Sequence, residues 1–562
     1  MGDATRSAAQ ALLEALAARG VDALFANPGT DFPSIIEAYA RPGAAPLPRA
    51  VLCTHEGVAV GMAHGHAMVS DRAQAVMVHV NVGAANALGG LFNAAREFVP
   101  MLFMAGRTPV TESGEAGART LNIHWAQEMF DQAGMLREAV KWDYELRRPG
   151  QAEAIAARAL SVARADPQGP VALLLPRETL AAEAPPAPMD EPPAVAPAAL
   201  DPGTAARIAE ALAGAERPMI VTASAGRDPA VPAMLADLAA RFGLRVVEFR
   251  PRYHALDNDH PMHGGFEVDP WLPEADVILV LECDVPWIPA IRSPRPGARV
   301  FHLGPDPLFG RYPVRGFGGE AAAAVSAAQA IPALSAALSE AARGGEGRIA
   351  ARATAMAAAH RDLRARSLPP EPAPDALLTQ AQASTILGRV LGGPGPDVMM
   401  VNEYPLVRGA MSFRHPATFF GSSPVGALGW GVPAAMGAKM AAPDRLAVAA
   451  VGDGSYVFAN PVACHQTAAA ENLPFLTVVF DNAGYGAVRR ATASIYPQGA
   501  AMAAGRIPLA DFAAVPDHAA IIRACGGQGW RVDRAGDLAP ALEAAVRAVR
   551  GGVQALVSVR VA

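Results

Sequence analysis

The sequence predicts an α/β protein with three doubly wound domains, each a parallel sheet covered by helices on both faces. Short apolar runs rich in β-branched residues, ending in Gly, Asn or Asp, alternate with alanine-rich segments of helical length. Two proline-rich breaks interrupt this alternation, at 184–203 and at about 341–378. A chain of 562 residues is too long for one core. We therefore expect domains at 1–183, 204–340 and 379–562.

Each domain has its own predicted strands. In the first they are DALFANPG, RAVLCTH, QAVMVHV and PMLFMAG, with helices at 56–70 and 84–98. In the second they are PMIVTAS, LRVVEF, DVILVLE and RVFHLG. In the third they are DVMMVNE, RLAVAAVGD, FLTVVFDN and ALVSVRV. Segment 489–520 shows no strand rhythm and is interpreted as a loop or lid near an active site.

The composition excludes several classes of protein. A net charge of −6 provides no basic face for nucleic acid. The longest apolar stretch, 421–442, is broken by prolines and a lysine, so no membrane span is expected. The N-terminal segment is amphipathic and lacks the basic and apolar regions of an export signal. Four cysteines lie far apart without a CxxC pair, which favours a reduced, cytoplasmic protein.

Two polar residues follow neighbouring predicted strands of the third domain. Asp453 ends RLAVAAVGD, and Asn482 ends FLTVVFDN 29 residues later, the length of one βαβ unit. Both should lie at the carboxyl edge of the sheet, where Mg²⁺ could take their oxygens and a carbonyl near Gly484. Backbone N–H groups of Gly454 and Ser455, opening the next helix, suit a phosphate. Alone, GDGS also fits an ordinary strand–turn–helix connection.

Two further segments have candidate residues. Glu56 opens the predicted helix 56–70, where by itself it could simply complement the helix dipole. The stretch GALGWGVPAAMGA includes Gly426 and Leu428, and could be only a glycine-rich turn before a buried helix.

Together these segments resemble the thiamine diphosphate-dependent superfamily that includes acetolactate synthase and benzoylformate decarboxylase. Its signature is GDG followed, some 25–30 residues later, by Asn-Asn; here Asp481 replaces the first Asn. The resemblance implies pyrimidine-binding, middle and diphosphate-binding domains in that order. It also implies thiamine diphosphate and Mg²⁺ as cofactors, with the metal held by Asp453 and Asn482.

The same resemblance assigns roles around the cofactor's rings. Glu56 matches the glutamate that bonds N1′ of the aminopyrimidine, where burial would let it share a proton. Leu428 matches the apolar residue that holds the cofactor bent, and Gly426 would offer its carbonyl to the N4′ amine. His64 and His66 stand where the family usually has an acid and a tyrosine.

Three residues are candidates for the substrate side. His79, at the end of QAVMVHV, matches an active-site histidine of benzoylformate decarboxylase, although a strand-end histidine is often structural. Segment 27–30, NPGT, resembles that enzyme's GNPGS loop, so Thr30 could bond a substrate carboxylate. Gln127 matches a glutamine lining the site in acetolactate synthase and benzaldehyde lyase, and could otherwise be a surface helix residue.

The resemblance implies an enzyme that cleaves or forms a C–C bond next to a carbonyl. The expected reaction is decarboxylation of a 2-oxo acid, carboligation, or both. A 2-hydroxyacyl-CoA or acyloin lyase on the same scaffold and a non-catalytic regulatory subunit are the alternatives. The middle domain has no GxGxxG in the strand–helix context that a dinucleotide needs, so FAD stays open. A homodimer or homotetramer with active sites at the subunit interface is implied.

Overall fold

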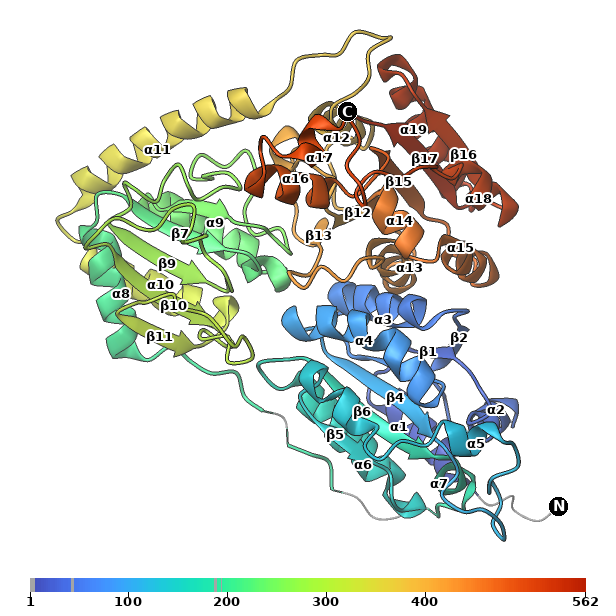
Figure 1. Ribbon diagram of the computed structural model, residues 1–562. Coiled ribbons are helices and arrows are strands. Elements are labelled where there is room, and N and C mark those ends of the chain that lie inside the picture. The colour runs from blue at the N-terminus through green and yellow to red at the C-terminus, as the bar shows by residue number, and fades with distance from the viewer. Residues whose placement is uncertain (1–5, 42–44, 186–189, 194) are drawn as a thin grey trace. The chain divides into compact units, whose positions relative to one another are not determined.

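The structure is a computed structural model that describes residues 6–41, 45–185, 190–193 and 195–562. Three parallel sheets with flanking helices confirm the predicted fold class (Figure 1). By internal packing the chain forms two units. The first comprises Met1–Val195, Ser422–Arg531 and Ala544–Val559, and the second Ala196–Gly421, Val532–Glu543 and Arg560–Ala562. The three predicted domain ranges stay predictions.

The first sheet has strand order β2-β1-β3-β4-β6-β5, and its strands pair in parallel. The strands are β1 Ala23–Asn27, β2 Arg49–Leu52, β3 Gln74–Val78, β4 Met101–Arg107, β5 Asp143–Glu145 and β6 Pro170–Pro176. The helices are α1 Ala8–Ala18, α2 Pro33–Ala40, α3 Glu56–Ser70, α4 Val80–Arg96, α5 Ile123–Ala126, α6 Ala152–Arg164 and α7 Arg177–Ala181. Four of the six strands were predicted; β5 and β6 were not.

Helix α3 packs against α13 (Gly431–Ala441) at backbone distance. A Cβ atom on Gly65 would lie 1.9 Å from the carbonyl oxygen of Ala434, and one on Gly437 would lie 1.9 Å from that of Met62. Only glycine permits this approach. The contact joins the helix that begins with Glu56 to the helix that follows the 426–429 turn.

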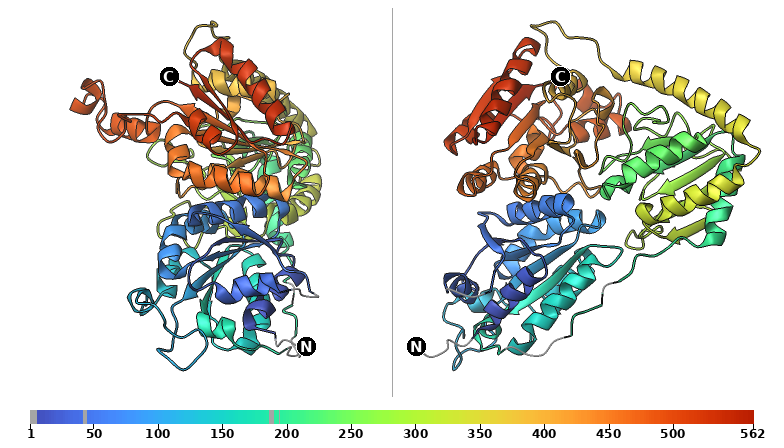
Figure 2. Two further views of the ribbon diagram at one scale, coloured as in Figure 1. Left: turned by 90° about the vertical axis from the view of Figure 1, so that its right-hand side faces the viewer. Right: turned by 180° about the vertical axis from the view of Figure 1, so that it is seen from behind.

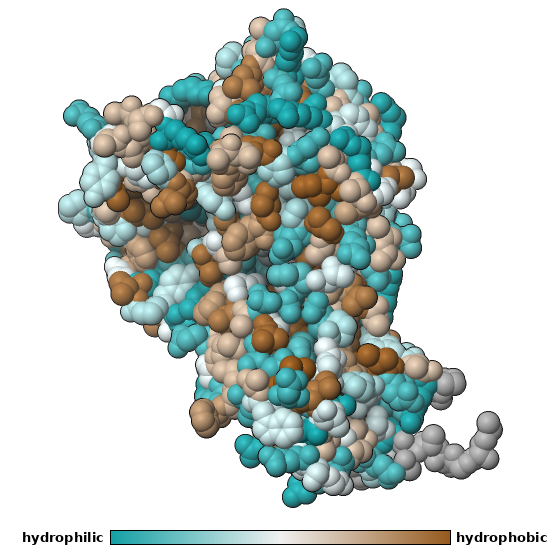
Figure 3. Space-filling model, turned by 45° about the vertical axis from the view of Figure 1, so that its right-hand side comes forward, coloured by the Kyte–Doolittle hydropathy of each residue, from teal (hydrophilic) through white to brown (hydrophobic). Residues whose placement is uncertain are grey.

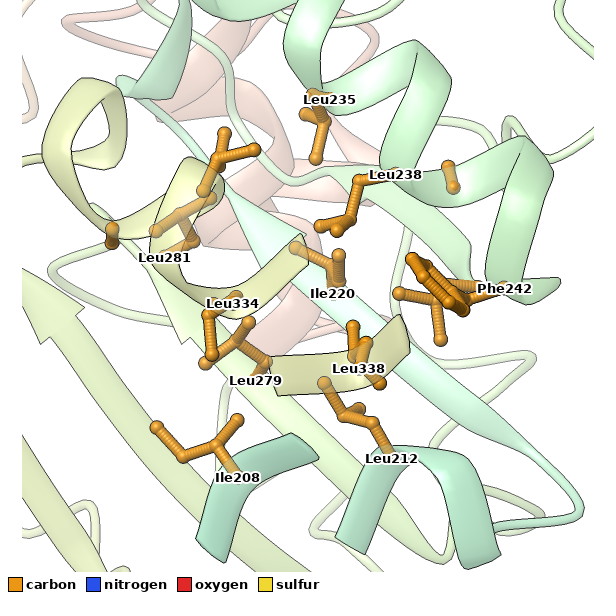
Figure 4. Packing of buried hydrophobic residues seen from close by; sticks show 14 of the residues in the cluster. Ile208, Leu212, Ile220, Leu235, Leu238, Phe242, Leu279, Leu281, Leu334 and Leu338 are labelled. Atoms are coloured by element: carbon orange, nitrogen blue, oxygen red, sulfur yellow. The ribbon is translucent and has the colours of Figure 1, made fainter. Parts of the chain in front are cut away.

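The second sheet belongs to the second unit and has the order β11-β10-β9-β7-β8. Its strands are β7 Pro218–Thr222, β8 Arg245–Glu248, β9 Val277–Leu281, β10 Arg299–Gly304 and β11 Ala321–Ala324. Helices α8 Pro202–Gly214, α9 Val231–Phe242 and α10 Ala327–Ala341 cover it. Their leucines and Phe242 converge on Ile220 of β7 and Leu279 of β9 (Figure 4).

The second predicted break is corrected by the structure. Much of 341–378 is a 22-residue helix, α11 (Glu346–Ser367). Alanine and arginine favour helix here, and only GGEG and SLPPEPAPD at the two ends behave as breaks. Arg352 anchors the helix by donating to the carbonyls of Leu212, Ala215 and Phe242. In the first break, residues 186–189 and 194 lie outside the described part, residues 184–185, 190–193 and 195–201 form neither helix nor strand, and α8 begins at Pro202.

The third sheet has the order β13-β12-β14-β15-β17-β16. The strands are β12 Val398–Glu403, β13 Phe419–Gly421, β14 Leu446–Gly452, β15 Leu476–Asp481, β16 Gln528–Val532 and β17 Ala555–Arg560. Its other helices are α12 Gln380–Val390, α14 Asp453–Phe458, α15 Pro461–Ala470, α16 Gly486–Ile495, α17 Ala500–Ala503, α18 His518–Ala524 and α19 Ala535–Arg550. Segment 489–520 contains most of α16, all of α17 and the start of α18, with irregular chain between them, and α16 and α17 extend outward from the sheet (Figure 2).

The surface mixes polar and apolar residues. On the face shown in Figure 3, hydrophobic residues form separate patches among hydrophilic ones, as on most folded proteins. Among the described residues, no helix has both the length and the apolar character that crossing a membrane requires.

Candidate active site

A buried carboxylate lies where β14 meets α14. Asp453 is 2% exposed, and its two oxygens accept hydrogen bonds from the N–H groups of Gly454 (2.9 Å) and Gly484 (3.0 Å). The second bond ties the loop after β15 to the start of α14. Burial raises the pKa of Asp453 to about 6, helped by the nearby charge of Asp481 and opposed by the two N–H donors.

Asn482 supplies a second side-chain oxygen at the end of the strand that pairs with β14. It follows β15 directly, and its side-chain Oδ1 is buried without a hydrogen-bond partner. A buried, unpartnered amide oxygen is costly unless something binds it. Gly484 is needed for close approach, because a Cβ atom there would lie 2.4 Å from the carbonyl oxygen of Ala510. One carboxylate, one amide oxygen and a nearby backbone segment suit Mg²⁺.

The two residues after Asp453 were predicted to open the next helix. Gly454 and Ser455 form the first turn of α14 and are buried. A Cβ atom on Gly454 would lie 2.7 Å from the Tyr485 ring. In the described part of the chain, no group of three or more His, Cys, Asp and Glu side chains could hold a metal ion. The predicted donor set has only one such side chain, so it is of a different type.

The turn containing Gly426 and Leu428 is fixed from α4. Gly426 (φ +69°) and Gly429 (φ +85°) adopt left-handed conformations that favour glycine. Asn93, 2% exposed, donates its amide to the carbonyl of Ala427 (2.9 Å), and its Oδ1 accepts the Ala427 N–H (3.3 Å). The half-buried Leu428 side chain is therefore presented from a tightly held turn.

Glu56 is the first residue of α3 and is 8% exposed. The cap of that helix is His55, whose Nδ1 accepts the Gly57 N–H at 3.0 Å. Glu56 is thus not needed for capping. Its Oε2 accepts a hydrogen bond from the Asn86 amide at 3.2 Å. Within the described residues it makes no hydrogen bond to Asp453 or Asn482 of the same chain.

The two histidines that depart from the family pattern have structural partners. His64 is fully buried and contacts Glu97 through Nε2 at 2.7 Å. His66 contacts Ser70, and burial lowers its pKa to about 4.

The substrate-side candidates do come together. His79 lies between Asp31, 2.5 Å from its Nδ1, and Gln127, whose Nε2 is 3.2 Å from its Nε2. Thr30, Asp31 and Gln127 line a shallow hollow that His124 also borders and that encloses no space for a water molecule. Asp31 raises the pKa of His79 mainly through its hydrogen bond, against an opposing effect of burial.

Three residues of the site were not predicted: Asp31, Asn86 and Asn93. Asp31 directly follows the NPGT motif, so its position next to Thr30 was an available signal. Asn86 and Asn93 resemble ordinary polar positions of a helix. Only the fold shows that they bind Glu56 and Ala427.

Comparison with known proteins identifies the chain. Residues 6–135 match the family model "Thiamine pyrophosphate enzyme, N-terminal TPP binding domain", and residues 404–559 match "Thiamine pyrophosphate enzyme, C-terminal TPP binding domain". The chain belongs to the thiamine diphosphate-dependent enzymes. The two matched segments contain Glu56 and the pair Asp453 and Asn482, respectively.

Several members of this enzyme family are similar over most of their length. "Probable 2-ketoarginine decarboxylase AruI" of Pseudomonas aeruginosa is 28% identical over 503 residues, 86% of this chain and 84% of that protein. Sulfoacetaldehyde acetyltransferase of Castellaniella defragrans is 27% identical, covering 96% and 90%. The solved 4-hydroxybenzoylformate decarboxylase of Rhodococcus jostii RHA1 has a TM-score of 0.79 at 24% identity, covering 99% of each chain. This last likeness confirms the fold.

Proposed function

We propose that this thiamine diphosphate-dependent enzyme uses Mg²⁺ and decarboxylates a 2-oxo acid, with or without joining the product to a second carbonyl compound. The observation that carries this proposal is His79, held between Asp31 and Gln127, two residues that line one hollow with Thr30. Release of an aldehyde after a 2-oxo acid loses CO₂ requires one proton at the carbon that CO₂ leaves, whereas in carboligation that carbon bonds to the second carbonyl carbon instead. A positioned imidazole is the usual donor for such a proton at neutral pH. The decarboxylases among the similar proteins agree with this choice.

Asp453, Asn482 and the Gly484 carbonyl would hold the magnesium ion, which in turn neutralises the diphosphate. The N–H groups opening α14 would face the phosphate oxygens. When bound, thiamine diphosphate supplies a nucleophilic carbon and an electron sink. The buried Asn482 Oδ1, which lacks a partner, supports this placement.

Glu56 would hold a proton at the aminopyrimidine N1′. Its burial and its single amide partner, Asn86, leave one oxygen for that hydrogen bond. Leu428 would pack beneath the bound group, and Gly426 would orient its amine. Thr30 would bind the substrate carboxylate, and Gln127 would line the site.

We also propose that Glu56 of one subunit serves the metal site of another, in a homodimer or homotetramer. Two observations support this. Glu56 makes no hydrogen bond to Asp453 or Asn482 within the described chain. Apolar side chains on α4 and α14 are also exposed, with Val82 at 49%, Val457 at 44% and Phe458 at 59%, as expected of surfaces that another subunit covers.

The test titrates the purified protein with thiamine diphosphate at millimolar Mg²⁺ and with EDTA, followed by circular dichroism. Exchange of the cofactor's C2 proton for deuterium is measured in parallel. We expect metal-dependent binding, exchange in the wild type, and loss of exchange with retained binding in Glu56→Gln. Decarboxylation of pyruvate, benzoylformate and 2-ketoarginine is then compared. Binding without exchange in the wild type would instead favour a non-catalytic protein.

A further inference from the structure

Both carboxylate oxygens of Asp31 contact the residues that directly follow strand β3. The residue lies between β1 and α2 and is 4% exposed. Its Oδ1 is 2.5 Å from His79 Nδ1, and its Oδ2 accepts the backbone N–H of Val80 at 3.3 Å. One buried side chain therefore fixes both the imidazole ring and the backbone that follows it.

The surroundings of this pair allow little movement. A Cβ atom on Gly106 would lie 1.6 Å from Asp31 Oδ2, and one on Gly29 would lie 2.2 Å from the His79 ring. Both side chains thus lie directly against backbone. Val80 has φ +32°, a conformation that β-branched residues rarely adopt. Backbone strain of this kind persists only where the surrounding structure enforces it, often at functional sites.

Nε2, the second ring nitrogen of His79, faces the side-chain amide of Gln127. That amide can donate to Nε2 when His79 is neutral and accept from it when His79 is charged. In neutral His79, Nδ1–H donates to Asp31, and Nε2 can accept from Gln127 Nε2 at 3.2 Å. The Oε1 atom of Gln127 is then buried without a partner. In charged His79, Nε2–H can donate to that Oε1 after the amide turns over. Because Asp31 occupies Nδ1, proton exchange is confined to Nε2.

His79 is not enclosed by its own chain, since 16% of its side chain is exposed. The charged and titratable groups that face it come from several elements. Asp31 before α2, Glu56 at the start of α3 and His124 on α5 interact electrostatically with His79, and Arg107 at the end of β4 and Arg177 at the start of α7 line the hollow that Asp31 and Gln127 border. Asp31 is the one in direct contact, so its removal should affect His79 more than any other single change.

We propose that Asp31 is a positioning residue that keeps Nδ1 of His79 protonated and turns Nε2 toward Gln127 as the proton-transferring atom. This inference rests on the proposed function, in which His79 supplies the proton. In that step the Nε2–H bond breaks, a C–H bond forms at the carbon that lost CO₂, and solvent returns the proton to Nε2. No oxidant or reductant is required.

The test uses the full-length holoenzyme and Asp31→Asn, which keeps the shape and removes the charge. Deuterium exchange at Cε1 of His79, read by peptide mass spectrometry, gives the pKa of this histidine alone. We expect that pKa to fall by one unit or more in Asp31→Asn. We also expect kcat to fall about 100-fold, as for loss of a general acid, with KM little changed. Turnover is measured on the fastest substrate among pyruvate, benzoylformate and 2-ketoarginine.

Controls separate the possible failures. Asp22→Asn alters an acidic residue at the opposite end of β1, where Asp22 accepts from Gln74, and should change neither readout. Asp31→Asn combined with His79→Ala should be no slower than His79→Ala, because both act through one group. An unchanged His79 pKa and pH profile in Asp31→Asn would overturn the positioning role. A wild type that fails to bind thiamine diphosphate would refute the proposed function itself.

Discussion

Asn93 of α4 binds Ala427 through both halves of its side-chain amide, donating to the carbonyl and accepting from the N–H. The carbonyl of Asn93 also accepts a hydrogen bond from the Ser423 hydroxyl at 3.2 Å. One residue of the N-terminal matched segment therefore sets the turn between Gly426 and Leu428. The turn that we propose to contact the cofactor is thus held by a helix far from it in sequence.

Replacing Asn93 should loosen this turn. In Asn93→Ala, the N–H and carbonyl groups of Ala427 each lose a hydrogen bond. A buried polar group left without a partner destabilises the fold by about 1–3 kcal/mol. We expect thiamine diphosphate to bind about tenfold more weakly or worse, measured by calorimetry at fixed Mg²⁺. Ala85→Ser, an exposed position on the same helix, is the matched control. If Asn93→Ala and the wild type bound thiamine diphosphate equally well, the turn would not depend on the Asn93 hydrogen bonds.

Substitutions should distinguish the proposed metal ligands, Asp453 and Asn482, from the adjacent Asp481. Asp453→Asn and Asn482→Ala are expected to abolish the Mg²⁺-dependent part of cofactor binding, because each removes a proposed ligand. Asp481→Asn introduces the usual family residue and should retain binding. Calorimetric titrations with and without EDTA compare the three variants. Asn482→Ala that still responds to Mg²⁺ would exclude Asn482 as a ligand.

A mixing experiment tests the shared site. Chains with Glu56→Gln and chains with Asp453→Asn are each expected to be inactive. If Glu56 serves another subunit's metal site, hybrids of the two contain one site with both native residues. Mixed, dissociated and reassociated chains should then regain activity that neither parent shows. Persistent inactivity, with light scattering confirming hybrids, would mean that each site lies within one chain.

The crossing of α3 and α13 should not tolerate a methyl group. Gly65→Ala places Cβ against the Ala434 carbonyl, and overpacking of this kind costs about 1–3 kcal/mol or more. We expect a lower Tm and weaker cofactor binding. Gly347→Ala is the control, since a Cβ atom at Gly347 in α11 meets nothing within 4 Å. That variant should be unchanged or slightly more stable.

A buried ion pair should stabilise the second unit. Arg408 is 3.5 Å from Glu248, and its guanidinium lies 4.1 Å from the centroid of the Phe419 ring. Arg408→Leu leaves the buried Glu248 carboxylate without this cation, at an expected cost of about 3–5 kcal/mol. Arg414→Leu removes an exposed pair with Asp259 and should cost under about 1 kcal/mol. Thermal unfolding compares the two.

The same glutamate predicts a pH dependence. Burial raises the pKa of Glu248, but the Arg408 charge and the His263 hydrogen bond outweigh it and hold the pKa at about 2, below the ordinary 4.5. Because the pKa of Glu248 is lower in the folded state, its ionised form stabilises the fold above pH 4.5. This contribution to the free energy of unfolding is lost as the pH falls toward 2. Denaturant unfolding across this range should show less pH dependence in Glu248→Gln than in wild type. Parallel curves would exclude this contribution.

Central strands were more predictable than edge strands. Buried parallel strands such as β9 and β14 are continuous apolar runs, which the sequence shows directly. The unpredicted strands β5, β11, β13 and β16 all lie at sheet edges. They are short or partly exposed, and β11 is four alanines, which favour helix. The unpredicted β6 is an exception, because all seven of its residues are buried and most are apolar.

Within the site, sequence motifs located the residues but not their partners. Asp453, Asn482 and Glu56 were predicted because each occurs at a strand end or helix start in a recognisable motif. Asp31 and Asn93 depend on contacts across 48 and 334 residues. Such pairings are set by tertiary packing, which local patterns do not record.

The glycine-lined crossing of α3 and α13 also limits how this enzyme could diversify. Where two helix backbones touch, there is no side chain whose size can be altered to shift one helix along the other. The starts of both helices are therefore held at a constant separation. If Thr30 and Gln127 contact the substrate as proposed, new substrate preferences would arise in the loops around them, where amino-acid changes leave the crossing of α3 and α13 undisturbed.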